Sequence, residues 1–190
     1  SLEEYIDYLT QAYHHVKHTV PLLMACGSRL GQDYEWLREA MAEYVEEELG
    51  HQKWILNDIK AAGGDPEKAK NTPPSKSCEL MVSYAYDMIN RRDPLGFLGM
   101  VHVLEGTSVK AATEAANRLG EKLNLPKKAF SYLLSHGDLD ISHVDFFKSL
   151  VNKVKKEEDL EVIIKSSEMF FFLFGNVFRE LDKKNNEVFA

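Results

Sequence analysis

The sequence predicts an all-α protein, one bundle of about seven helices, and three observations support this. Apolar residues recur every three or four positions along most of the 190 residues, which is the period of an amphipathic helix. No segment of the sequence alternates apolar and polar residues as strands do. No internal repeat or low-complexity linker divides the chain, and 44% hydrophobic residues can fill a core. We therefore expect residues 1–190 to form a single domain.

Helix signals in the first part of the chain predict two helices and a loop. The apolar spacing over residues 2–16 predicts a helix that bends or breaks before Pro21. A long helix is predicted over residues 33–62, with Asp33 as its N-cap and Gly63-Gly64-Asp65-Pro66 as its stop. Residues 67–73 are predicted to form a loop.

Start signals delimit the remaining helices. A serine, Ser75 or Ser77, caps a helix that runs to about residue 92. Asp93-Pro94, an N-cap followed by proline at the first helical position, begins a helix that runs to about residue 123. Asn124 and Pro126 precede a further helix, whose path through Gly137 stays open, and the last helix covers about residues 157–183.

Composition excludes several classes of partner. The net charge of −7 argues against a surface for nucleic acid or for anionic membranes. The longest apolar run, around residues 169–174, is far shorter than the roughly 20 residues that a membrane span needs. No signal peptide is visible, and Cys26 and Cys78 are more simply explained as reduced thiols than as a disulfide. These features predict a cytoplasmic protein.

Three stretches of the sequence carry residues that bind metal ions. Glu48 and His51 stand at i and i+3, and His136, Asp140 and His143 at i, i+4 and i+7, so each set can share one face of a helix. The third stretch contributes Glu105. Three carboxylates and three imidazoles are a suitable ligand set for two ions such as ferrous iron. The sequence therefore predicts a metal site inside a helical bundle.

Glu105 is the most informative of these residues. Its neighbours from Phe97 to Leu104 are nearly all apolar, so its helix is expected to be buried on most sides. A buried carboxylate is costly unless it is paired or binds a metal ion. The alternative to a metal ion is a salt bridge with a basic partner such as His102, one turn earlier.

The other two motifs have alternative explanations when taken alone. Glu48 belongs to the acidic run of residues 46–48, which could be a solvated face, and His51 could be a half-buried histidine with its own hydrogen bonds. His136 and His143 could flank an exposed turn, because Gly137 and Asp138 together suggest a helix break. The combination of all three motifs favours the metal site over these separate explanations.

Taken together, the pattern resembles the heme-oxygenase-like di-metal oxidases, relatives of the TenA, PqqC and CADD-like proteins. Members carry a Glu and a His on one core helix, a Glu on the next, and a His-x-x-x-Asp-x-x-His segment on a third. Those ligands match Glu48, His51, Glu105, His136, Asp140 and His143, in order and over essentially the whole chain. One departure is that Tyr44 stands where many members place the first carboxylate, seven residues before His51. Only a subset uses the spacing of Glu48, and Glu47 is a competing choice.

The resemblance implies a heme-oxygenase-like fold and a non-heme di-iron oxidase or oxygenase. Two Fe(II) ions, or manganese, would activate dioxygen to oxidise a small organic molecule in specialised or cofactor metabolism. Glu105 would bridge the ions. His102 would either hydrogen-bond to one of the metal ligands or act as the catalytic base, and the alternative is a histidine of the core. The resemblance also implies a homodimer, and a third core helix that becomes ordered when metal binds.

The substrate is not identified by the sequence. Relatives act on fatty acids and on amino acids, so the resemblance implies an apolar or amino-acid-like substrate. Phe170, Phe171, Phe172, Phe174 and Phe178 stand close together near the C-terminus. Phenylalanines at such spacing more often belong to a core than to a pocket.

Other functions on the same scaffold stay open. A thiaminase-like TenA enzyme would need a nucleophilic cysteine in the core, and Cys26 and Cys78 lie outside the segment from His136 to His143. A heme oxygenase would use a histidine of the first helix, for which His14, His15 and His18 are available, but the expected glycine-rich distal helix is missing. A metal-free PqqC-like enzyme and a non-enzymatic binding protein are the remaining alternatives.

Overall fold

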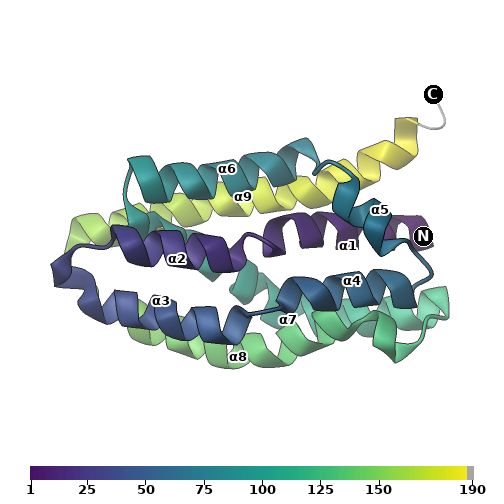
Figure 1. The fold of residues 1–190 in the computed structure, drawn as a ribbon, viewed down its shortest axis with the longest axis horizontal. Coiled ribbons are helices and arrows are strands. Elements are labelled where there is room, and N and C mark those ends of the chain that lie inside the picture. Colours follow the sequence, from purple (N-terminus) through teal and green to yellow (C-terminus); the bar gives the residue numbers. More distant parts are fainter. Residues whose placement is uncertain (188–190) are drawn as a thin grey trace.

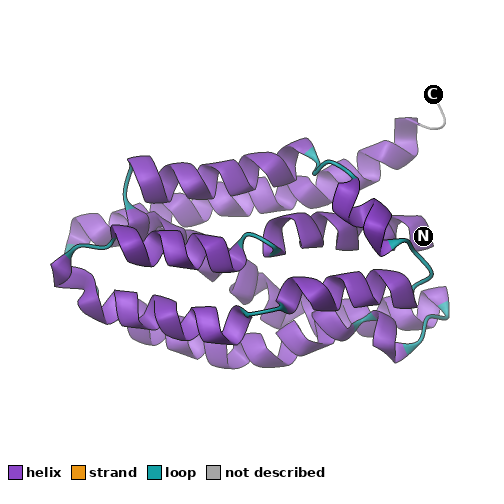
Figure 2. Cartoon of the chain, in the orientation of Figure 1, coloured by secondary structure: helices purple, strands orange, loops and turns teal. Residues whose placement is uncertain are grey.

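The computed structural model describes the backbone of residues 1–187 and all side chains in that range except those of 138–141 and 182–187. In this part of the chain every regular element is helical (Figures 1 and 2). The α-helices are α1 (Leu2–Val16), α2 (Thr19–Arg29), α3 (Glu35–Glu48), α4 (His51–Ala61), α5 (Pro66–Asn71), α6 (Lys76–Arg91), α7 (Phe97–Leu123), α8 (Ser131–Val151) and α9 (Glu157–Glu187). Short 3₁₀ turns, η1 (Gln32–Tyr34), η2 (Pro94–Gly96) and η3 (Lys127–Ala129), precede α3, α7 and α8.

Several predicted boundaries are confirmed. The first helical segment breaks at Lys17-His18, before Pro21. The Ser75 side chain accepts a hydrogen bond from the backbone N–H of Cys78, and that of Asp93 accepts one from Leu95, as N-caps do. Asn124 ends α7 in the left-handed conformation, at φ 50°.

Two predictions for the first half of the chain are wrong. The expected helix over residues 33–62 is two helices, because Gly50 adopts a left-handed backbone, φ 94°, between α3 and α4. Asp33 lies in η1 and is not the N-cap of α3, a position that Tyr34 takes. The expected loop at residues 67–73 is mostly α5, because Asp65 caps the backbone N–H groups of Glu67 and Lys68 and Pro66 starts the helix.

Helix α7 makes its most extensive contacts with the two longest helices that follow it, α8 and α9. It packs against α8 on one side and α9 on another, and α6 lies along α9. Helices α3 and α4 follow one another end to end beside α8, as α1 and α2 do nearby (Figure 1). The joint between α3 and α4 therefore lies midway along the bundle.

Two clusters of buried apolar residues leave a polar stretch between them. The first includes Leu37, Tyr44 and Val103, and the second includes Ile55, Ala112 and Leu133. On α7, residues up to 103 belong to the first cluster and residues from 112 to the second. The predicted ligands on α3, α4, α7 and α8 fall in the interval between the clusters.

Glycine sets the distance between α7 and α8 at one crossing. A Cβ atom on Gly137 would lie 2.1 Å from Oγ1 of Thr113 and 3.3 Å from its Cβ atom. Helix α8 continues through Gly137, so this glycine does not break the helix. It is required instead because the two backbones approach closely.

Two further sequence expectations can be compared with the fold. Cys26 and Cys78 are both buried free thiols, as expected. Among the described residues, no helix combines the length and apolar content of a membrane span.

Candidate metal centre

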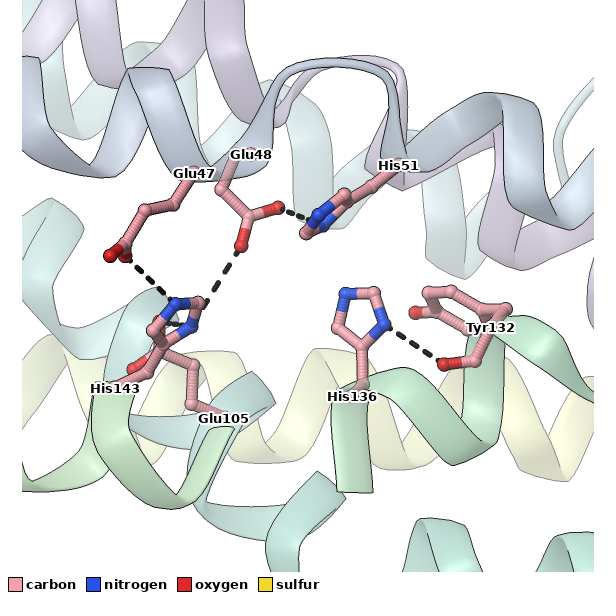
Figure 3. Close-up of polar contacts among 7 residues, drawn as sticks. All are labelled: Glu47, Glu48, His51, Glu105, Tyr132, His136 and His143. Atoms are coloured by element: carbon pink, nitrogen blue, oxygen red, sulfur yellow. Dashed lines mark hydrogen bonds and ion pairs between the residues drawn. The ribbon is translucent and has the colours of Figure 1, made fainter. Parts of the chain in front are cut away.

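The break between α3 and α4 turns the two predicted ligands of this region toward each other. Glu48 is the last residue of α3 and His51 the first of α4. Oε2 of Glu48 lies 2.9 Å from Nδ1 of His51, and Figure 3 shows the pair above helix α8. Both side chains are buried, at 10% and 4% exposure. The left-handed backbone of Gly50 thus brings Glu48 and His51 together. In the predicted single helix, their i and i+3 spacing was expected to do this.

His136 approaches this pair from α8. One ligand atom each from Glu48, His51 and His136 lie within 4.8 Å of one another. Nδ1 of His136 lies 2.9 Å from the carbonyl oxygen of Tyr132, which can only accept a hydrogen bond (Figure 3). This contact places the ring proton on Nδ1 and leaves the lone pair of Nε2 for a metal ion.

His143, two turns further along α8, forms a second group with three carboxylates. Its Nε2 lies 2.9 Å from Oε2 of Glu47, and its Nδ1 lies 3.5 Å from Oε1 of Glu105 and 3.9 Å from Oε1 of Glu48 (Figure 3). Glu48 therefore faces both groups, with one carboxylate oxygen toward His51 and the other toward His143.

The histidines of the two groups favour the ionised form of Glu48. Burial opposes ionisation of Glu48, but the hydrogen bond with His51 and the nearby His136 and His143 lower its pKa below the usual value. Burial and the nearby carboxylates of Glu105, Glu47 and Glu48 raise the pKa of Tyr44, which packs edge-on to His143. Glu48 is accordingly a carboxylate at neutral pH and Tyr44 a neutral phenol.

The structure brings five of the six predicted ligands together, and the side chain of the sixth, Asp140, lies outside the described residues. Glu47, the competing choice for the first ligand, also reaches the group, although its side chain is 48% exposed. The donor set fits iron, since it combines imidazole nitrogens with carboxylate oxygens. Burying the carboxylates of Glu48 and Glu105 side by side is costly unless cations compensate them.

His102 is not among the clustered ligand residues, and its exposed side chain makes the core-histidine alternative wrong, while a catalytic role stays a prediction. Its side chain is exposed and stacks on Phe147, with ring centroids 5.2 Å apart. Two residues three apart on a helix differ by about 60° in direction. That angle turns His102 outward while Glu105 faces the interior.

A cavity of about 580 Å³ adjoins the metal ligands. Glu48, Glu105 and His136 form part of its wall, and most of the remaining wall is apolar and comes from α1, α2, α7 and α9. Phe171 and Phe178 line the cavity and are also 64% and 41% exposed, so the cavity reaches the surface along α9.

The expectation that the phenylalanines of α9 form a core is correct only in part. Phe170 is fully buried in the core, whereas Phe171, Phe174 and Phe178 line the cavity. Their positions in the sequence do not distinguish these environments, because the face of α9 that meets the cavity depends on how the helix packs.

Asp58 positions α8, a role that sequence reasoning missed. Its fully buried carboxylate accepts hydrogen bonds from the hydroxyl of Ser131 and from the backbone N–H of Tyr132, the latter at 2.8 Å. Tyr132 in turn accepts the hydrogen bond from His136. Burial raises the pKa of Asp58 although both hydrogen bonds oppose this. The contact fixes the first turn of α8 to α4 and thereby orients His136.

Asp58→Ala is expected to lower the free energy of unfolding by about 2–3 kcal/mol, because the donors of Ser131 and Tyr132 lose a fully buried carboxylate acceptor. The measurement is urea denaturation of the metal-free chain. Asp65→Ala, which removes an exposed helix cap, is the control and should cost only about 1 kcal/mol. Equal losses for both variants would contradict a positioning role of Asp58.

Comparisons with known proteins identify the family and the fold of the chain. A family model described as "Iron-containing redox enzyme" matches residues 6–173. A domain of unknown function with a heme oxygenase-like fold from Shewanella denitrificans superposes with a TM-score of 0.89 at 21% identity, over 100% of this chain and 82% of that one. A CADD-like protein of unknown function from Nostoc punctiforme superposes with a TM-score of 0.74 at 18% identity, over 97% of this chain and 80% of that one.

A TenA homologue from Pseudomonas syringae pv. tomato gives a TM-score of 0.73 at 12% identity, over 95% of this chain and 78% of that one. A comparison with curated proteins finds no match. The predicted fold class is therefore confirmed as all-α and heme-oxygenase-like.

Proposed function

Since this chain belongs to the family of iron-containing redox enzymes, we propose that it is a non-heme di-iron oxidase or oxygenase. It would use dioxygen to oxidise a small organic molecule. The observation that carries this proposal is the pair of adjoining ligand groups that share Glu48.

Each ligand group supplies residues for one metal ion. Glu48, His51 and His136 would hold one iron, and Glu105 and His143 would hold the other, with Asp140 retained as a ligand from its place in the sequence. Glu48 would contribute to both metal positions, a role first expected of Glu105, because its two oxygens face the two groups. Ferrous iron supplies the electrons that reduce dioxygen, and manganese suits the same ligands.

The protein residues around the irons orient ligands and hold the substrate. The carbonyl of Tyr132 fixes the ring of His136, and the hydroxyl of Tyr44 is held next to Glu105. The apolar wall of the cavity favours an apolar substrate of modest size over a sugar or nucleotide.

A TenA-like reaction that uses a cysteine nucleophile is not supported. Burial raises the pKa of both Cys26 and Cys78 to about 12, so neither is a thiolate at neutral pH. Neither cysteine contributes to the cavity wall next to the ligand groups.

The proposal is tested by titrating the metal-free chain with ferrous iron under anaerobic conditions and measuring bound iron. About two irons per chain are expected, followed by consumption of dioxygen when air is admitted. Binding of one iron would contradict the paired site. No binding would favour a metal-free enzyme or a binding protein on the same fold.

Iron is also expected to increase the hydrogen-exchange protection of residues 131–151. Ligands from α8 bind the metal only when this helix is formed, so the binding free energy stabilises it. The measurement is exchange by mass spectrometry with and without ferrous iron. Helix α6, which contributes none of the proposed ligands, is the internal control. Equal protection of α8 in both states would contradict coupling between metal binding and folding.

A further inference from the structure

His15, on α1, is a buried side chain in the cavity wall that the proposed metal centre does not use. It is 4% exposed, and its ring meets Phe174 edge-on, with centroids 6.1 Å apart. Its buried Nδ1 atom has no hydrogen-bond partner among the described residues. Buried polar atoms without a partner are uncommon in folded proteins, so this one calls for a physical explanation.

The ring is electrically neutral. Burial, together with the nearby His136, His18 and His14, lowers the pKa of His15 to about 3. A neutral imidazole has one N–H donor and one acceptor nitrogen, so it can hydrogen-bond to a hydroxyl or donate to a carbonyl. It offers no positive charge with which to hold a carboxylate.

The position of His15 suits contact with a bound molecule. It shares the cavity wall with His136, Glu48 and Glu105, but it is not among the residues whose ligand atoms cluster for a metal ion. In a pocket that is mostly apolar, a few polar groups determine how a ligand is oriented.

We infer that His15 is a substrate-binding residue whose imidazole hydrogen-bonds to an uncharged oxygen, a hydroxyl or a carbonyl, on an otherwise apolar substrate. The inference rests on the proposed function in one respect, that the cavity holds the substrate. The hydrogen bond fixes the substrate relative to His136 and its neighbours. It also selects against molecules that have the same apolar body but lack the oxygen.

Two matched probes test this inference, benzyl alcohol and toluene, which differ by one hydroxyl group. Their affinities for the full chain are measured by calorimetry, both without metal and with ferrous iron under anaerobic conditions. The ring nitrogens of His15 are followed in parallel by ¹⁵N NMR. Because binding to the metal-free chain requires neither iron nor turnover, failure here is distinguishable from failure of the di-iron proposal.

His15→Phe is expected to weaken binding of benzyl alcohol about tenfold, the effect of losing roughly one hydrogen bond, and to change toluene binding less than about twofold. His15→Gln, which keeps a donor and an acceptor, should stay within about threefold of the original chain for both probes. Benzyl alcohol, and not toluene, should shift the ¹⁵N signals of His15.

His14→Phe is the matched control. His14 is equally buried on the same helix but does not line the cavity, so its replacement should leave both affinities unchanged. Equal weakening of both probes by His15→Phe would show a packing role and overturn the inference. Binding of benzyl alcohol without a ¹⁵N shift at His15 would overturn it as well.

Discussion

Glu48→Gln is expected to abolish the metal centre, lowering bound iron from about two per chain to less than one. The variant keeps the size of the side chain but removes the negative charge that faces His51 on one side and His143 on the other. The loss of iron affinity should exceed the 10- to 100-fold loss that is typical of changing a residue that only orients ligands. The measurement is iron content after anaerobic titration and gel filtration.

Glu47→Gln is the control for this experiment. Glu47 precedes Glu48 in α3 and reaches His143, but its side chain is 48% exposed. The variant should retain close to two irons and show at most a modest loss of affinity. If Glu47→Gln lost iron and Glu48→Gln kept it, Glu47 would be the first ligand and the proposed role of Glu48 would be wrong.

Gly137→Ala is expected to destabilise the metal-free chain by about 1–3 kcal/mol, because the added Cβ atom overpacks the crossing of α7 and α8. Oγ1 of Thr113 would lie 2.1 Å from it, and rotation of Thr113 would still leave its Cβ atom at 3.3 Å. Helix propensity alone predicts the opposite, a gain of about 1 kcal/mol for alanine. Urea denaturation of the metal-free chain decides between the two effects.

Gly106 provides a matched control on the facing helix. A Cβ atom there would meet nothing within 4 Å, so Gly106→Ala should stabilise the chain by up to about 1 kcal/mol. The double variant Gly137→Ala/Thr113→Ala removes the closest clash and should recover most of the loss. If Gly137→Ala stabilised the chain as Gly106→Ala does, close packing would not be the reason for this glycine.

The ligand residues could be predicted from the sequence because their chemistry is independent of exact helix boundaries. Glu105 stood out as a carboxylate among apolar neighbours, and His136 and His143 shared a helical face whether or not Gly137 broke the helix. The resemblance then supplied their order. The contacts of these residues in the structure agree with that choice, although Asp140 is not described beyond its backbone.

The errors come from effects that depend on tertiary structure. Whether Gly50 adopts a left-handed conformation is decided by packing of α3 and α4 on both sides of it, since the sequence also permits a continuous helix. His102 and Glu105 are one turn apart, and only the packing of α7 decides which of them faces inward. His15 was considered only as a heme ligand, because its place in the wall of a cavity requires α1, α7 and α9 together.

The division of the interior into two apolar clusters has a consequence for unfolding. Helices α7 and α8 pass through both clusters, but the interval between them is held by polar contacts among Glu48, Glu105 and His143. Apolar contact between the two clusters runs through the rings of Phe174, Phe178 and Tyr8, on α9 and α1. Bound iron would add a cross-link between the two clusters at the polar interval and raise the free energy of unfolding. The metal centre would then contribute to the stability of the folded chain as well as to its chemistry.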